Sequence, residues 1–236
     1  MMDVKRLEYG QTVHGIFYKR LNRFVAEVFI QGKKEKVHVK NTGRLKELLQ
    51  QGADVQLEVS SNPNRKTKYS LIAAKKDGSW VNIDSQAPNV IAYEALKTGR
   101  IREFGFVEDV KREVTYRHSR FDLSYRKGDD QGFIEVKGVT LKKGQIAMFP
   151  DAPTMRGTKH VNELIQAVRD GYQATVLCIG SIQGCRGSKP NQGMDRQFSN
   201  ALREAADNGV QILAYDVIEK DRRLVLNQQL PVIMSE

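Results

Sequence analysis

The sequence has few of the features that define several large classes of protein. It has only two cysteines and four scattered histidines among 236 residues, which excludes a disulfide scaffold and argues against a structural zinc site. No apolar run approaches the roughly 18 residues that a membrane-spanning helix needs. Residues 1–10 carry four charges in place of an apolar stretch, so we expect no secretory signal, no membrane partner and a cytoplasmic protein.

An excess of positive charge is the first informative feature that is present. Lysine and arginine total 38 against 28 aspartates and glutamates, a net charge of +10. Residues 1–84 hold 16 basic and 9 acidic side chains, so most of the excess lies in the first third of the chain. Such a distribution is typical of proteins that bind polyanions such as DNA, although a protein can be basic without binding one.

Residues 12–84 contain short runs with the alternating polar and apolar pattern of strands. The runs are 13–18, 24–30, 36–40, 55–59, 69–73 and 80–83. Between the third and fourth runs, Leu45, Leu48 and Leu49 predict a short helix, which Asn41 or Thr42 would cap. This order predicts a closed β-barrel of the OB type, a fold that binds single-stranded nucleic acid.

Basic side chains gather near the turns of this predicted barrel. They are Lys33, Lys34, Lys36, Arg65, Lys66 and Lys68. On a nucleic-acid-binding barrel these side chains would contact phosphates. On any other small β-domain they would only keep the strand edges in solution, and both interpretations stay open.

The pattern changes after a polar junction that ends at Pro88, so we predict two domains, residues 1–84 and 85–236. In the second domain, Asn89 is expected to cap the first helix, Cys178 to lie in a buried strand and Cys185 in an exposed loop. The expected order is helix 89–98, strands 104–114, 116–125 and 133–141, helix 158–170, strand 174–179, helix 195–208 and strand 210–215. This order predicts an α/β (α+β) fold with a mixed sheet.

Two carboxylates and a lysine are the residues most suggestive of chemistry. Glu135 and Lys137 stand two apart in one predicted strand and share a face, and a tight connection would bring Asp122 of the preceding strand beside them. Adjacent carboxylates repel unless a cation intervenes. Mg²⁺ or Mn²⁺ takes oxygen ligands, so Asp122, Glu135 and the Val136 carbonyl are candidate ligands. The expected reaction is phosphodiester hydrolysis, with Lys137 beside the attacking water.

The same residues also have an ordinary interpretation. Glu-Val-Lys alternation is common on a solvated sheet face, and Asp122 could simply pair with Arg120 or Lys137. The surrounding order of helices and strands favours the catalytic interpretation, because it resembles the frame of the PD-(D/E)xK nucleases. In those enzymes the upstream helix often contributes another glutamate, for which Glu94 is the candidate here.

A loop with two prolines precedes the helix predicted from residue 158. Helix N-termini attract anions, so Arg156 and Lys159 are expected to contact phosphate close to Asp122. His160 would assist by carrying a proton or contacting nucleic acid, or it would be structural.

Five segments resemble the sugar fermentation stimulation protein family (SfsA). They are 38–45, 65–69, 119–122, 134–141 and 149–160, and the resemblance as a whole runs from about residue 12 to residue 216. The resemblance implies an N-terminal OB-like domain and a C-terminal domain like PD-(D/E)xK restriction endonucleases, with Asp122, Glu135 and Lys137 as the nuclease-type site. It also implies DNA binding without sequence specificity and regulation of sugar metabolism, notably of maltose.

The resemblance places residues 41–44 in a signature of the family, and we count Arg44 among the expected nucleic-acid contacts. It also implies a helix-turn-helix over residues 197–216, but the alternating run after Gly209 predicts a strand there. We therefore expect a sequence-nonspecific DNA-binding protein with a nuclease-like metal site. The alternative is an active Mg²⁺-dependent nuclease acting on DNA or RNA. The DNA that is bound could be single-stranded, and the protein could form a homodimer.

Overall fold

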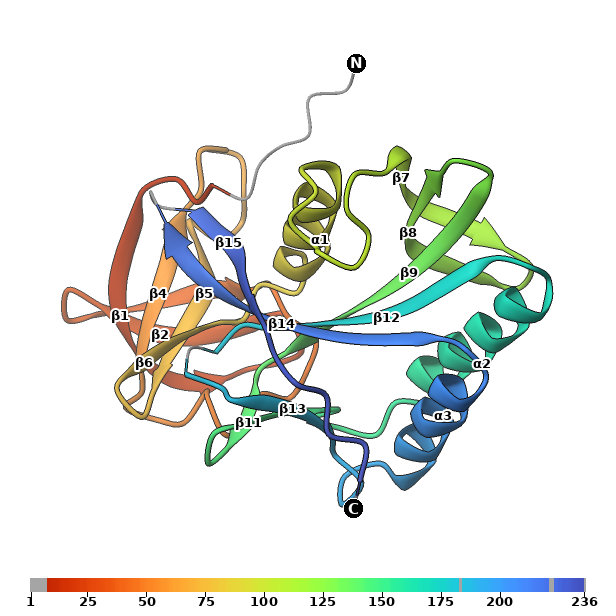
Figure 1. Cartoon of the computed structure of the whole chain (residues 1–236). Coiled ribbons are helices and arrows are strands. Elements are labelled where there is room, and N and C mark those ends of the chain that lie inside the picture. The colour runs from red at the N-terminus through yellow and green to blue at the C-terminus, as the bar shows by residue number, and fades with distance from the viewer. Residues whose placement is uncertain (1–7, 183, 221–222, 236) are drawn as a thin grey trace.

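The computed structural model describes residues 8–182, 184–220 and 223–235, which form a β-barrel beside a mixed sheet (Figure 1). The barrel strands are β1 (Thr12–Arg20), β2 (Val25–Ile30), β3 (Lys33–Val39), β4 (Asp54–Val59), β5 (Tyr69–Lys76) and β6 (Ser79–Asn82). They are ordered β3-β2-β1-β4-β5-β6, and a parallel pairing of β3 with β5 closes the first five strands. Alternate residues point inward, as in β2, where Ala26, Val28 and Ile30 are buried. The OB-like barrel expected from the sequence is confirmed.

The helix predicted between the third and fourth strands is not formed. Residues 41–49 adopt turns and irregular backbone, and Leu45 has a positive φ of 48°, which is incompatible with a right-handed helix. The guanidinium of Arg20 donates hydrogen bonds to the carbonyls of Asn41, Gly43 and Arg44, which would otherwise accept helical ones. The three leucines on which the prediction depended are nevertheless buried. Their spacing therefore reflects side chains that point inward from an irregular segment.

The C-terminal half is built on a second six-stranded sheet, ordered β15-β14-β12-β9-β8-β7. Its strands are β7 (Glu108–Tyr116), β8 (Ser119–Lys127), β9 (Asp130–Val139), β12 (Gln173–Gly180), β14 (Gln211–Lys220) and β15 (Arg223–Gln229). β12 runs parallel to β9 and β14, and the other pairs are antiparallel. The mixed sheet confirms the expected fold class.

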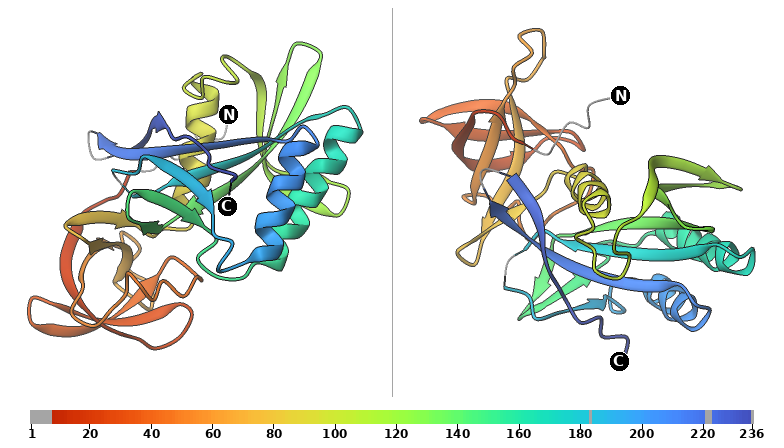
Figure 2. Two further views of the ribbon diagram at one scale, coloured as in Figure 1. Left: turned by 60° about the horizontal axis from the view of Figure 1, so that its bottom comes forward. Right: turned by 45° about the horizontal axis from the view of Figure 1, so that its top comes forward.

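Helices cover both faces of this sheet (Figure 2). α1 (Ala87–Lys97) packs on one face, while α2 (Met155–Arg169) and α3 (Arg196–Asp207) pack on the other. A turn and β14 follow α3, as predicted, in place of a second helix of a helix-turn-helix. A small sheet that the sequence did not predict joins β10 (Leu141–Lys143), β11 (Ile146–Phe149) and β13 (Gly187–Pro190). Within the described ranges, no helix is both long and apolar enough to cross a bilayer.

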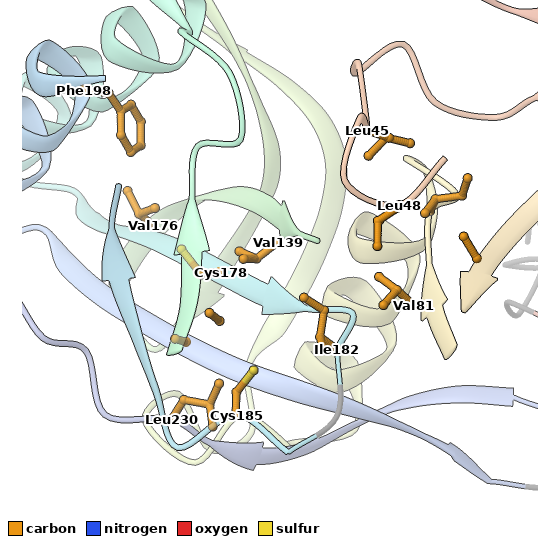
Figure 3. Close-up of a cluster of buried hydrophobic side chains, with 14 of the residues drawn as sticks. Leu45, Leu48, Val81, Val139, Val176, Cys178, Ile182, Cys185, Phe198 and Leu230 are labelled. Carbon is orange, nitrogen blue, oxygen red and sulfur yellow. The ribbon is translucent and has the colours of Figure 1, made fainter. Parts of the chain in front are cut away.

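One hydrophobic cluster continues from the barrel into the mixed sheet (Figure 3). Leu48 and Val81 of the barrel face Ile182, which follows β12, and the cluster extends to Cys185. Cys185 was expected to be exposed, but it is only 2% exposed and lies beside Leu230 in this cluster. Cys178 is buried as expected.

Candidate functional site

The candidate site lies where β8 and β9 separate. Their antiparallel ladder runs from the Lys127–Asp130 pair to the Leu123–Ile134 pair. Just beyond it, Oδ2 of Asp122 accepts a hydrogen bond from the backbone nitrogen of Val136 at 2.8 Å. The carboxylate thus takes the role of a strand partner, and it is held beside residues 135–137 as the sequence predicted.

The first turn of α1 supplies a second contact to this carboxylate. Nδ2 of Asn89 donates to Oδ1 of Asp122 at 2.6 Å. Asn89 was predicted to cap the helix, but α1 begins earlier, after Gln86, so Asn89 lies inside the helix with its side chain turned to β8. Nothing in the sequence indicated this contact, because it depends on how α1 packs against the sheet.

A glycine in β9 makes that packing close. A β-carbon at position 138 would lie 2.7 Å from Cγ of Pro88, which is nearer than side chains normally approach. Gly138 therefore allows the first turn of α1 to approach the strand that carries Glu135 and Lys137. The result is that Asn89 reaches Asp122.

Glu135 is the buried centre of the cluster. It is 4% exposed, and its Oε1 accepts from Nζ of Lys137 at 2.6 Å and lies 2.7 Å from Nδ1 of His160 on α2. Its other oxygen, Oε2, is buried and makes no hydrogen bond with any described residue. His160, which was expected to carry a proton, to contact nucleic acid or to be structural, is buried, and its ring contacts Glu135.

The two carboxylates differ in their ease of ionisation. Burial and the nearby Glu135 raise the pKa of Asp122 to about 6, although the Val136 N–H, Lys137 and Asn89 oppose this shift. Burial also disfavours the charged form of Glu135, but its hydrogen bond with His160 and the charge of Lys137 outweigh burial and hold its pKa below the usual range. Mutual repulsion between paired carboxylates is the condition that a bound cation relieves.

These donors fit a hard divalent cation that keeps much of its water. In the part of the chain that the structure describes, no group of three or more His, Cys, Asp or Glu side chains is arranged to hold a metal. The site therefore offers two carboxylates, Asp122 and Glu135, and the buried Oε2 of Glu135 makes no hydrogen bond with any described residue. Mg²⁺ is usually bound in this way, through one or two carboxylates and several waters.

Three other residues predicted for this site, Glu94, Arg156 and Lys159, lie on α1 and α2. Glu94 is five residues beyond Asn89 on α1, about 140° further round the helix. Its buried Oε1 makes no hydrogen bond with any described residue. Arg156 is exposed in the first turn of α2, and Nζ of Lys159 donates to the carbonyl of His118 at 3.0 Å. The roles of Glu94, Arg156 and Lys159 stay predictions.

The basic residues of the barrel fall into three groups. Lys33, Lys34 and Lys36 are exposed on β3, and Arg44 is exposed in the irregular segment before β4. Lys66 and Lys68 are exposed in the connection between β4 and β5, where Arg65 is half-buried and donates to Oγ of Ser70 at 3.0 Å. Their expected contacts with nucleic acid stay predictions as well.

Comparison with known proteins shows what this arrangement is similar to. The family model described as "SfsA N-terminal OB domain" matches residues 19–83, and "Sugar fermentation stimulation protein RE domain" matches residues 86–222. A sugar fermentation stimulation protein homolog of Alkaliphilus oremlandii is 50% identical over 232 residues, covering 96% of this chain and 98% of the relative. A homolog from Acetivibrio thermocellus is 45% identical over 229 residues, with the same coverage.

A solved structure agrees with these matches. The SfsA of Pyrococcus furiosus, described in complex with Ca²⁺, is 30% identical and superposes with a TM-score of 0.88. The match covers 97% of this chain and 99% of that one. The barrel, the mixed sheet and the sequence matches over both of them lead to one conclusion: the chain belongs to the sugar fermentation stimulation protein family.

Proposed function

We propose that this protein binds DNA without sequence specificity and holds a divalent cation, Mg²⁺ or Mn²⁺, at Asp122 and Glu135. The observation that carries the proposal is the pair of carboxylates where β8 and β9 separate, with a buried Glu135 oxygen that makes no hydrogen bond with any described residue. The relative described in complex with Ca²⁺ supports cation binding in this family.

The net charge of +10 supports a polyanionic partner, because lysines and arginines that neutralise phosphates release counterions when DNA binds. A role in regulating sugar metabolism, maltose in particular, belongs to the same proposal; the description of the family as sugar fermentation stimulation proteins supports the role in sugar metabolism.

Phosphodiester hydrolysis is the second candidate function, and Lys137 is the observation that favours it. Its ammonium is half-buried beside Glu135, where it can neutralise charge on a bound phosphate. Asn89 and the Val136 N–H orient Asp122, while His160 orients Glu135. A divalent cation, when bound, would lower the pKa of a coordinated water and stabilise phosphate charge.

Two measurements on the whole protein test these functions. Calorimetric titration with Mn²⁺ should show binding that Asp122→Asn and Glu135→Gln abolish, with Lys127→Ala as an exposed control. Labelled DNA should bind in EDTA with an affinity that falls steeply as salt rises. Cation binding absent from the wild type would refute the metal site.

Incubation of labelled DNA and RNA with Mg²⁺, Mn²⁺ or EDTA separates the binder from the nuclease. Cleavage that requires the metal and is lost in Asp122→Asn and Lys137→Ala would establish the enzyme. Binding without cleavage in every metal would leave a DNA-binding protein with a metal site.

A further inference from the structure

Two aromatic rings lie together on the outer face of the barrel. Tyr18 of β1 and Phe29 of β2 are edge to face, with ring centroids 5.6 Å apart. Both are half-buried, whereas their chain neighbours Phe17 and Val28 point inward and are fully buried. Ile16, which is 36% exposed, pairs with Phe29 across the strands. The outer face therefore presents an apolar surface that is not needed for the barrel core.

A β-bulge brings Lys19 to this face beside Tyr18. Phe17 pairs with Val28 and Lys19 pairs with Glu27, so the register shifts at Tyr18, the extra residue. In a regular strand Tyr18 and Lys19 would point to opposite faces. Here both lie outside, because Tyr18 contacts Phe29 while Lys19 reaches Glu27 at 3.7 Å. A bulge is a common device for redirecting a side chain.

Lysines surround the two rings. The Lys34 ammonium lies 4.2 Å from the ring centroid of Tyr18 and 5.5 Å from that of Phe29. The Lys19 ammonium lies 5.5 Å from the Tyr18 centroid. Lys36 alternates with Lys34 on β3 and is exposed, and it pairs across the strands with Glu27. Lys19 and Lys36 are thus neighbours of Glu27, and Lys34 lies over the rings. With three lysines and one carboxylate, this surface complements a polyanion.

We propose that Tyr18 and Phe29 form a stacking platform for unpaired bases, and that Lys19 and Lys34 bind the phosphates on either side. Aromatic rings combined with a basic surface are the means by which OB barrels bind single strands. A duplex hides its base faces, so this platform selects single-stranded nucleic acid. A strand's phosphate attracts the Lys34 ammonium away from the Tyr18 ring, which leaves the ring to a base. The inference rests on the proposed nucleic-acid binding and names the strand that is bound.

The test is fluorescence anisotropy of the whole protein in EDTA, with labelled oligothymidylate, oligouridylate and a hairpin duplex of equal length. The wild type is expected to bind the single strands more tightly than the duplex. Tyr18→Ala and Phe29→Ala should each weaken single-strand binding about tenfold or more and leave duplex binding unchanged. Tyr18→Phe and Phe29→Tyr each keep an aromatic ring, so these variants should bind the single strands as tightly as the wild type. Lys34→Ala should reduce the salt dependence by about one phosphate contact.

Matched variants separate stacking from a structural effect. Phe29→Leu keeps an apolar side chain without a ring, so it should lose single-strand affinity as Phe29→Ala does while its melting temperature stays close to that of the wild type. Phe106, which is 85% exposed in the other half of the molecule, is the control, and Phe106→Ala should bind like the wild type.

Three outcomes would overturn the platform. Equal affinity for duplex and single strands, with ring variants that bind like the wild type, refutes it and leaves the proposed DNA binding intact. Wild-type binding by Phe29→Leu refutes stacking as the contact. A wild type that binds none of the three probes refutes the platform and the proposed DNA binding together.

Discussion

The contact between α1 and β9 can be tested with one methyl group. Gly138→Ala places a β-carbon 2.7 Å from Cγ of Pro88, whereas ordinary contacts begin at 3.4 Å. Because proline is rigid, the first turn of α1 has to move away by about 0.7 Å. If Asn89 moves with it, its 2.6 Å hydrogen bond to Asp122 lengthens to about 3.3 Å, past the usual limit.

Two quantities should change together. Overpacking of this kind destabilises a protein by about 1–3 kcal/mol, so the free energy of unfolding should fall by that amount. Loss of a partner that orients a metal ligand lowers metal affinity by about 10- to 100-fold, so Mn²⁺ affinity at the proposed site should fall within that range. Asn89→Ala should lower the affinity by a similar factor without the clash.

Urea unfolding and Mn²⁺ titration of both single variants and the double variant measure these effects. The double variant should lose no more Mn²⁺ affinity than either single variant, because both changes act through the same hydrogen bond. Gly193→Ala is the matched control, since a β-carbon there meets nothing within 4 Å. Unchanged stability and Mn²⁺ affinity in Gly138→Ala would refute the argument.

Three other predictions concern the stability of the barrel and the shared core. Lys40 lies 3.2 Å from the buried Asp84, so Lys40→Met should destabilise the protein by about 3–5 kcal/mol in urea unfolding. Burial opposes the Lys40 charge, but nearby carboxylates outweigh burial and raise the pKa of Lys40. The contribution of Lys40 to the stability of the folded protein should therefore be complete below the ordinary lysine pKa of about 10.4 and disappear at higher pH. Arg20→Ala removes the donor that fixes the connection between β3 and β4, so limited proteolysis should cut there first. Cys178 and Cys185 are buried, and burial raises the pKa of Cys178 to about 11, so a thiol reagent should react with them only after unfolding.

Much of the fold followed from periodicity. Strands with a period of two and helices flanked by glycine were predicted within a few residues, and the order of elements led to the barrel and the mixed sheet. The helix predicted for residues 41–49 was wrong because leucines spaced by three and four positions fit both a helix and an irregular segment whose side chains point inward. The small sheet of β10, β11 and β13 was missed because it pairs residues 146–149 with 187–190, and very short strands carry little pattern.

The candidate site was predictable only in part, for a related reason. Glu135 and Lys137 share a face by strand geometry, and an antiparallel neighbour brings Asp122 to them. Asn89 required knowledge of how a helix packs on the sheet, which one sequence does not contain. The same limit applies to Glu94, which was placed by analogy with a helix whose rotation about its axis the sequence leaves open.

The hydrophobic cluster shared by the barrel and the mixed sheet sets the distance between the outer face of the barrel and the carboxylates of β8 and β9. Because Leu48, Val81 and Ile182 pack in one core, a movement of the barrel relative to the carboxylates of β8 and β9 would disrupt that packing. A strand held at Tyr18 and Phe29 would then meet Asp122 after a constant number of nucleotides. If the protein cleaves such a strand, the fragments should have a uniform length measured from the bound end, whatever their sequence.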